Sequence, residues 1–195
     1  MNNRIREPMH RLIQEEDFHT LHDKSLEMIK ENPSDYAGYW WRGISLTLIG
    51  RYPEAIKVLH EALKHADSED EESKIMSSLA KLFILQKKFE KARDYTLVSL
   101  ELNPRNNEAI LMRSITYAAT GRKNESQKLL EKNLSKFDHY ELAAAYALMK
   151  NKQQMLESLR KSFEEEPYRK TTVLYDPEFK HVLIDHDMKK LLNLS

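Results

Sequence analysis

Residues 36–67 read YAGYWWRGISLTLIGRYPEAIKVLHEALKHAD, and they contain the clearest periodic pattern in the chain. In each half, small and apolar residues recur three or four positions apart, which places them on one stripe of an α-helix. Gly50, between the halves, suits a tight turn. The stretch therefore predicts a helix, a turn and a second helix. The two stripes consist of Tyr39, Gly43 and Leu46, and of Ala55, Leu59, Ala62 and Leu63.

The same pattern returns further along the chain. Ala92 follows Ala55 by 37 positions, and Ser126 follows Ala92 by 34. Prolines, which have no amide hydrogen with which to continue a helix, close three of the units at Pro33, Pro104 and Pro167. Small residues recur near the middle of the first helices, where they let the paired helix approach closely. These small residues are Gly43, Ala80, Ser114 and Ala143.

This period and pattern resemble the tetratricopeptide repeat, a helical hairpin of about 34 residues. The residues that match the small and aromatic positions of that family are Gly43, Gly50, Tyr52, Ala55 and Ala62, whereas Tyr39 stands where Trp is usual and Arg42 where Leu is usual. The resemblance implies a single all-α domain over residues 1–195, a right-handed α-solenoid of four to five hairpins. The expected units are 2–35, 36–72, 73–106, 107–137 and 138–168.

A capping segment is expected over residues 169–195. Asp176 followed by Pro177 has the sequence of a helix start, with Asp176 as N-cap and Pro177 in the first turn. A second short helix is expected to begin near Asp187 and to run to Leu192. Such helices cover the apolar face that the last hairpin of a solenoid would otherwise expose.

The composition excludes several classes of function. The 195 residues include 31 Lys and Arg and 31 Asp and Glu, so the chain has no broad basic field for nucleic acid or an anionic membrane. Because there is no cysteine, disulfides, thiolate metal sites and cysteine nucleophiles are excluded. No apolar run approaches the roughly 18 residues of a membrane span, and no signal peptide is evident. We therefore expect a cytoplasmic protein without a cofactor, binding neither nucleic acid nor membrane.

The resemblance also implies a concave groove lined by the first helix of each hairpin. Consecutive helical residues point about 100° apart, so Tyr39, Trp40 and Trp41 cannot share one stripe. At least one large ring must face either a ligand in the groove or the N-terminal hairpin, and the sequence leaves both open. Carrying these positions along the array gives the expected groove residues Arg6, His10, Trp40, Trp41, Ile44, Leu48, Lys74, Ser78, Lys81, Met112, Ile115 and Tyr140.

Such a surface suits a partner protein or peptide, because aromatic rings supply rigid contact area and lysines supply point charges. The expected ligand carries an apolar anchor beside an acidic group. The sequence thus predicts a non-enzymatic adaptor or co-chaperone-like module.

Two other classes of function stay open. The first is a structural or regulatory subunit that acts through self-association, as a homo-oligomer, or by scaffolding an enzyme complex. The second is a small metalloenzyme that uses His19, His22 and Asp23, although histidines on exposed helices are far more often solvated than metal-bound. No Gly-rich phosphate loop or nucleophile elbow supports catalysis, so we expect no metal site and no catalytic residue.

Overall fold

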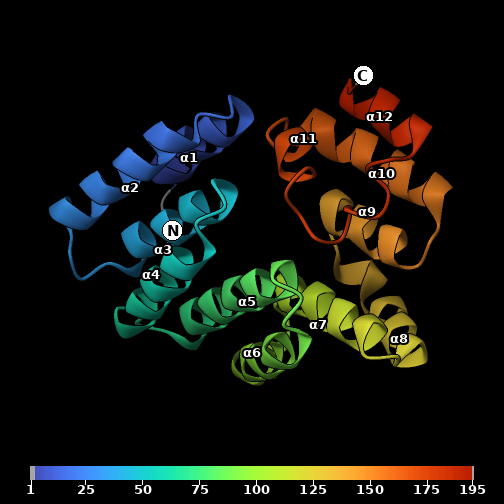
Figure 1. Ribbon diagram of the computed structural model, residues 1–195, viewed down its shortest axis with the longest axis horizontal. Helices are drawn as coiled ribbons and strands as arrows, with labels where there is room; N and C mark the ends of the chain where they lie inside the picture. Colours follow the sequence, from blue (N-terminus) through green and yellow to red (C-terminus); the bar gives the residue numbers. More distant parts are fainter. Residues whose placement is uncertain (1–2, 195) are drawn as a thin grey trace.

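A computed structural model describes residues 3–194, with side chains from residue 7 onward. The helices follow one another as five consecutive antiparallel pairs within these residues (Figure 1). The pairs are α1 (Asn3–Gln14) with α2 (Phe18–Glu31), α3 (Tyr36–Leu48) with α4 (Tyr52–Lys64), α5 (Glu69–Leu85) with α6 (Phe89–Leu102), α7 (Asn107–Ala119) with α8 (Lys123–Asn133), and α9 (His139–Leu148) with α10 (Lys152–Glu165). Between α8 and α9 lies a short 3-10 turn, η1 (Leu134–Lys136). The prediction of an all-α array of helical hairpins is confirmed.

Polar caps set where the hairpins begin. The side chains of Asp35, Ser68 and Asn106 accept hydrogen bonds from backbone amides in the first turns of α3, α5 and α7. At α9, Asp138 and Glu141 form a reciprocal capping box. The acidic run that follows Ser68 forms the first turn of α5, where its negative charge is attracted by the positive end of the helix dipole. The third hairpin therefore starts four residues before the expected boundary at residue 73.

The turn inside each hairpin carries one residue in the left-handed backbone region. These residues are Glu16, Gly50, Lys87, Gly121 and Lys150, with φ between 55° and 83°. Their spacings of 34, 37, 34 and 29 positions reproduce the sequence repeat in backbone geometry. Glycine adopts this conformation without the steric cost that a Cβ incurs, so Gly50 and Gly121 occupy the least strained of the five turns.

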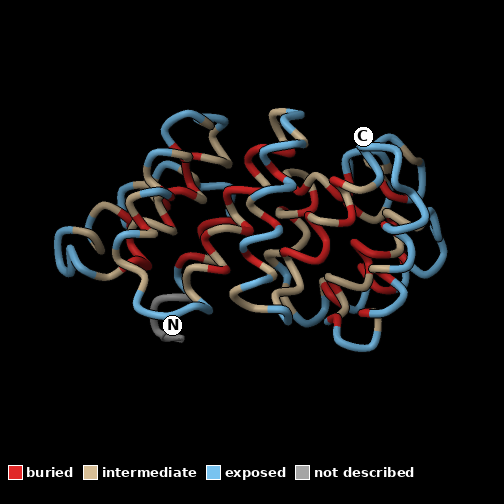
Figure 2. Tube along the Cα trace, turned by 90° about the horizontal axis from the view of Figure 1, so that it is seen from below, coloured by how far each residue is buried: buried red, intermediate tan, exposed pale blue. Residues whose placement is uncertain are grey.

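Close contacts between helices explain the small residues. A Cβ built on Gly43 would lie 2.6 Å from Leu59 Cδ2, so α3 and α4 pack with no room for a side chain there. Ala80 is fully buried. Ser114 is also fully buried, and its hydroxyl oxygen lies 2.6 Å from the hydroxyl oxygen of Ser126. This hydrogen bond between α7 and α8 gives the buried hydroxyl group of Ser114 a partner. Figure 2 shows the buried backbone concentrated where helices face one another, with the exposed backbone at the turns.

The C-terminal segment differs from the expected cap. After α10 come α11 (Arg169–Thr172), a run of turns, and α12 (His186–Leu192). The expected second helix is present, begun by Asp185 as N-cap, and its buried Met188 and Leu192 join the core of the last hairpins. The expected helix at Asp176 is absent, because residues 173–185 form turns and Asp176 points to other partners.

The same segment runs back to the first hairpin. Tyr168 stacks on His10 with ring centroids 3.9 Å apart, and Tyr175 meets the edge of Phe18 at 5.3 Å. The Thr171 hydroxyl donates to the Gln14 carbonyl at 3.4 Å, across 157 positions of sequence. Figure 1 shows α11 facing α1 at the open end of the array. The segment therefore closes the array instead of only covering its last repeat. None of the helices within residues 3–194 combines the length and apolar character needed to cross a bilayer.

Candidate functional site

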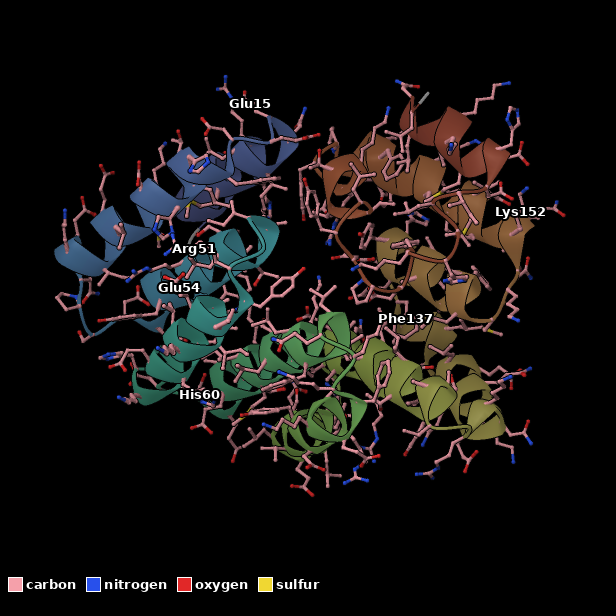
Figure 3. All side chains as sticks on the ribbon, in the orientation of Figure 1. Glu15, Arg51, Glu54, His60, Phe137 and Lys152 are labelled. Carbon is pink, nitrogen blue, oxygen red and sulfur yellow. The ribbon has the colours of Figure 1, made fainter. Side chains whose placement is uncertain are left out.

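A cavity of about 300 Å³ lies between the first helices of the hairpins and the C-terminal segment. Helices α3, α5, α7 and α9 form one side, while α1, α11 and the turns after α11 form the other. The labelled side chains of Glu15 and Lys152 point away from the space between these elements (Figure 3). The sequence-predicted residues that line the cavity are His10, Trp40, Trp41, Ile44, Leu48, Lys74, Ser78, Lys81 and Tyr140.

Of the other three predicted residues, Met112 and Ile115 are not among the described residues that line the cavity. The side chain of Arg6 lies outside the described residues. The placement of Met112 in the groove is wrong, because Met112 is fully buried in the hydrophobic core. Ile115 packs against that same core. On α7 the cavity is lined by Glu108, which follows the cavity residue Lys74 by 34 positions, and by Leu111.

The two tryptophans take different roles. Trp41 is 1% exposed and packs with Met9, Leu12, Ile13 and Leu21, so it seals the contact with the N-terminal hairpin. Trp40 is partly buried, and its indole N–H donates to the Ser78 hydroxyl at 3.1 Å. The ammonium of Lys74 lies 3.6 Å from the Trp40 ring centroid, a cation–π contact. Trp40 therefore presents its ring to the cavity, and Trp41 borders the cavity from within the core.

Lys81 forms an ion pair with Asp176 of the C-terminal segment. Asp176 also accepts a hydrogen bond from the hydroxyl of Tyr140 at 2.7 Å, and that hydroxyl accepts one from Thr172 at 3.0 Å. Burial acts to lower the pKa of Lys81, but the surrounding carboxylates, with Asp176 first among them, raise it above its usual value. The lysine expected to meet a partner's acidic group is thus paired within the chain.

Glu178 is one of the cavity residues that the sequence analysis missed. Its side chain is 4% exposed, and its Oε2 atom has no hydrogen-bond partner. Burial, reinforced by the nearby Asp176, raises the pKa of Glu178 to about 8. The sequence contains no sign that Glu178 is buried at the cavity, because the residues around it have the pattern of an exposed helix start.

Replacing Glu178 with Gln is expected to raise the free energy of unfolding at about pH 8.5 by about 3 kcal/mol, with little effect near pH 4. The folded state binds the proton of Glu178 more tightly than the unfolded state does. In the wild type, the stability that this proton contributes is fully present below the pKa of Glu178 in the unfolded state. It is lost as the pH rises through about 8, the pKa of Glu178 in the folded state. The charged groups facing Glu178 are Asp176 in its own segment, Lys81 on α5 and Glu108 on α7.

Urea unfolding of both proteins at the two pH values checks this expectation. The exposed Glu164 supplies the matched control, because Glu164→Gln should have the same free energy of unfolding as the wild type at both pH values. Equal stabilities of the wild type and Glu178→Gln across the whole range would contradict the burial of this carboxyl group.

Possible metal ligands are dispersed. Among residues 7–194, no group of three or more His, Cys, Asp or Glu side chains is arranged to hold a metal ion. His22, one of the candidate ligands, has its Nδ1 atom 3.2 Å from the Ser45 hydroxyl oxygen, and burial lowers its pKa. The contact directs that ring toward α3.

The arrangement of hairpins around the cavity has counterparts among solved structures. A crystal structure of MamA superposes with a TM-score of 0.55 at 18% identity, covering 92% of this chain and 95% of that one. The chain shares the TPR-like helical fold of MamA. A second MamA structure gives a TM-score of 0.52 at 16% identity, covering 82% of this chain and 88% of that one. A third, MamA AMB-1, gives 0.53 at 16% identity, with 82% and 95% covered.

The likeness to MamA concerns the fold alone at these identities. No protein-family model matches the sequence, and no curated protein matches it. One fold can serve many roles. What the chain binds must therefore be argued from its own cavity.

Proposed function

We propose that this chain is a non-enzymatic interaction scaffold that holds a partner protein or peptide at the inner face of its helical array. The observation that carries the proposal is Trp40, a partly buried ring presented to a cavity between the first helices. Tryptophan is the residue type most enriched among side chains that dominate binding energy. The position of Trp40 among the residues that line the cavity supports this proposal.

The size of the cavity defines how a partner would engage. A volume of about 300 Å³ accepts one or two side chains rather than a folded segment. The C-terminal segment borders the cavity through Asp176 and Glu178, and its Phe179 is buried in the hydrophobic core. In this proposal the partner therefore inserts an anchor side chain, and its neighbouring residues contact the rim.

Replacing Trp40 with Ala is expected to weaken capture of the partner from native lysate by about 10-fold or more, the effect of removing a central anchor. The matched control is Tyr117→Ala, because Tyr117 is a partly buried aromatic residue of α7 that packs beneath Arg113 and Arg122, away from the cavity. Quantitative mass spectrometry of proteins retained by the wild type and each variant makes the comparison.

Proteins lost only with Trp40→Ala support the proposal, and equal retention by all three forms argues against it. Size-exclusion chromatography with light scattering tests whether the inner face mediates self-association instead. A stable dimer of the purified chain that Trp40→Ala dissociates would assign the inner face to self-association.

A further inference from the structure

Residues 173–185, here called the strap, lie against the first helices of the array. The strap joins α11 to α12 as a run of turns without a helix of its own. Its Asp176 and Glu178 line the cavity together with residues of α3, α5 and α7. A segment of the chain itself therefore lies at the face that the proposed function assigns to a partner.

The contacts of Asp176 tie the strap to two of the first helices. Its carboxylate pairs with Lys81 of α5 and accepts a hydrogen bond from the hydroxyl of Tyr140 of α9 at 2.7 Å. Glu108, which also acts on Lys81, already accepts a hydrogen bond from the Ser77 hydroxyl at 2.7 Å. Removing one partner of such an ion pair leaves the other charge without compensation. An occupant that replaced the strap would therefore be favoured if it brought a carboxylate to Lys81.

Phe179, three residues after Asp176, supplies the apolar contact of the strap. Its side chain is 0% exposed, and its ring packs on Tyr140 with centroids 5.5 Å apart. Burial of such a ring contributes about 1.5–3 kcal/mol. The strap thus presents an acidic group and an aromatic ring to neighbouring positions of the array. This pair matches the apolar anchor beside an acidic group that the sequence predicts for the ligand.

Two features reduce the cost of releasing the strap. Glu178 is 4% exposed, and its Oε2 atom has no hydrogen-bond partner within the described residues, which costs about 1–3 kcal/mol. The backbone hydrogen bonds within the strap are local turns, from the Phe179 amide to Asp176 at 3.2 Å and from the Val182 amide to Phe179 at 2.9 Å. Lifting the strap therefore breaks no helix and relieves an unsatisfied contact.

We propose that the strap is an internal ligand, which a peptide displaces by presenting an acidic residue and, three positions later, an aromatic residue. The carboxylate of the peptide takes the place of Asp176 beside Lys81 and Tyr140, and its ring takes the place of Phe179. The inference rests on the proposed function, for which it names the chemistry of the partner and a segment that competes with it. Without a partner, the strap keeps the inner face occupied.

A peptide copied from the strap tests the displacement. The probe is TVLYDPEFKH, residues 172–181, labelled with a fluorophore at its N-terminus and amidated at its C-terminus. It is titrated into the full chain and followed by fluorescence anisotropy, beside a control peptide that carries the change Asp176→Asn. We expect weak binding to the wild type, because a tethered segment competes at an effective concentration in the millimolar range.

Two variants break the same ion pair from opposite sides. Asp176→Asn in the chain loosens the strap but leaves Lys81 for the peptide, so it should bind the peptide at least about 10-fold more tightly than the wild type does. Lys81→Met also loosens the strap but offers no cation, so it should show no such gain. Asp94→Asn is the matched control, because Asp94 forms an exposed ion pair with Arg93 on the outer helix α6.

The outcomes of these titrations are decisive. A gain confined to Asp176→Asn, with at least about 10-fold preference for the peptide over its Asn control, supports the proposal. An equal gain in Lys81→Met overturns the role of the ion pair. Equal affinity for the two peptides, or no binding to a folded Asp176→Asn chain at about 1 mM, overturns the proposal. Thermal unfolding confirms that each variant is folded.

Hydrogen exchange tests the competition in the wild type, without any substitution. NMR of an isotope-labelled chain detects only the amides of that chain when unlabelled peptide is added. Excess peptide should speed exchange at the amides of Phe179 and Val182, because the peptide and the strap cannot occupy the inner face together. The amide of Ile110, bonded to the Asn106 carbonyl in α7 at 3.0 Å, should be unaffected. Unchanged exchange in the strap while peptide is bound overturns the proposal.

The result is separable from the scaffold proposal. If the peptide fails to displace the strap while capture of partners still depends on Trp40, the internal-ligand inference is wrong and the scaffold proposal stands. If the peptide displaces the strap but Trp40→Ala retains every partner, the internal ligand is supported and the anchor role of Trp40 fails.

Discussion

Replacing Phe179 with Ala is expected to destabilise the chain by about 4 kcal/mol, the usual cost of removing a fully buried aromatic ring. Phe179 is 0% exposed and packs on Tyr140 with ring centroids 5.5 Å apart. It anchors the run of turns that carries Asp176 and Glu178 into the cavity, so its loss should also loosen that wall. Chemical unfolding gives the free energy, and acrylamide quenching of Trp40 reports the opened cavity.

A matched control comes from the same end of the chain. Leu194 is 41% exposed, so Leu194→Ala should change stability by less than about 0.5 kcal/mol. A Phe179→Ala protein as stable as this control, with tryptophan quenching unchanged, would contradict the placement of the C-terminal segment on the inner face.

Replacing Gly43 with Leu is expected to destabilise the chain by about 3 kcal/mol or more, because α3 and α4 leave no space for a side chain. A Cβ at this position would already lie 2.6 Å from Leu59 Cδ2 and 2.7 Å from Leu59 Cγ, and Leu59 is itself buried. Ala118→Leu, at an exposed position of α7, is the control for adding the same type of residue to a helix.

A double-mutant cycle locates the clash. Gly43→Ala should cost less stability in a Leu59→Ala background than in the wild type, because the truncated side chain no longer opposes the new methyl group. Additive effects would show that Gly43 and Leu59 do not meet.

The hairpin array could be predicted from the sequence because its determinants are local and periodic. Gly43, Ala80 and Ser114 each lie at a close helix contact, and the left-handed turn residues repeat with the same spacing. These features depend on neighbours within one or two hairpins. A pattern of residue types therefore contained enough information to specify them.

The residues of the cavity were harder to predict from the sequence, because their contacts join distant parts of the chain. Asp176 followed by Pro177 has the local sequence of a helix cap, yet Asp176 pairs with Lys81 and Tyr140 in the folded chain. Nothing near Asp176 indicates that choice. The burial of Met112 likewise involves distant residues, because Met112 belongs to a core cluster that includes residues of the last hairpin and the C-terminal segment.

The tryptophan pair lies between these two cases. Helical geometry required Trp40 and Trp41 to face different directions, and the structure assigns one to the cavity and the other to the N-terminal contact. Periodicity alone could not decide which was which, because both faces of α3 are covered by other elements.

The C-terminal segment closes the array onto its first hairpin, and a cysteine cross-link between the two tests this closure. The chain has no cysteine, so a pair introduced as Gln14→Cys and Thr171→Cys has no competing thiol. These positions are in contact in the closed array, with the Thr171 hydroxyl 3.4 Å from the Gln14 carbonyl oxygen. The comparison pair is Gln14→Cys with His60→Cys, since His60 lies on the outer helix α4 (Figure 3).

Treatment of dilute protein with a short bis-maleimide is predicted to give an intramolecular cross-link in high yield for the first pair and little for the second. No intramolecular product from the Gln14 and Thr171 positions, or equal yields from both pairs, would contradict the closed array.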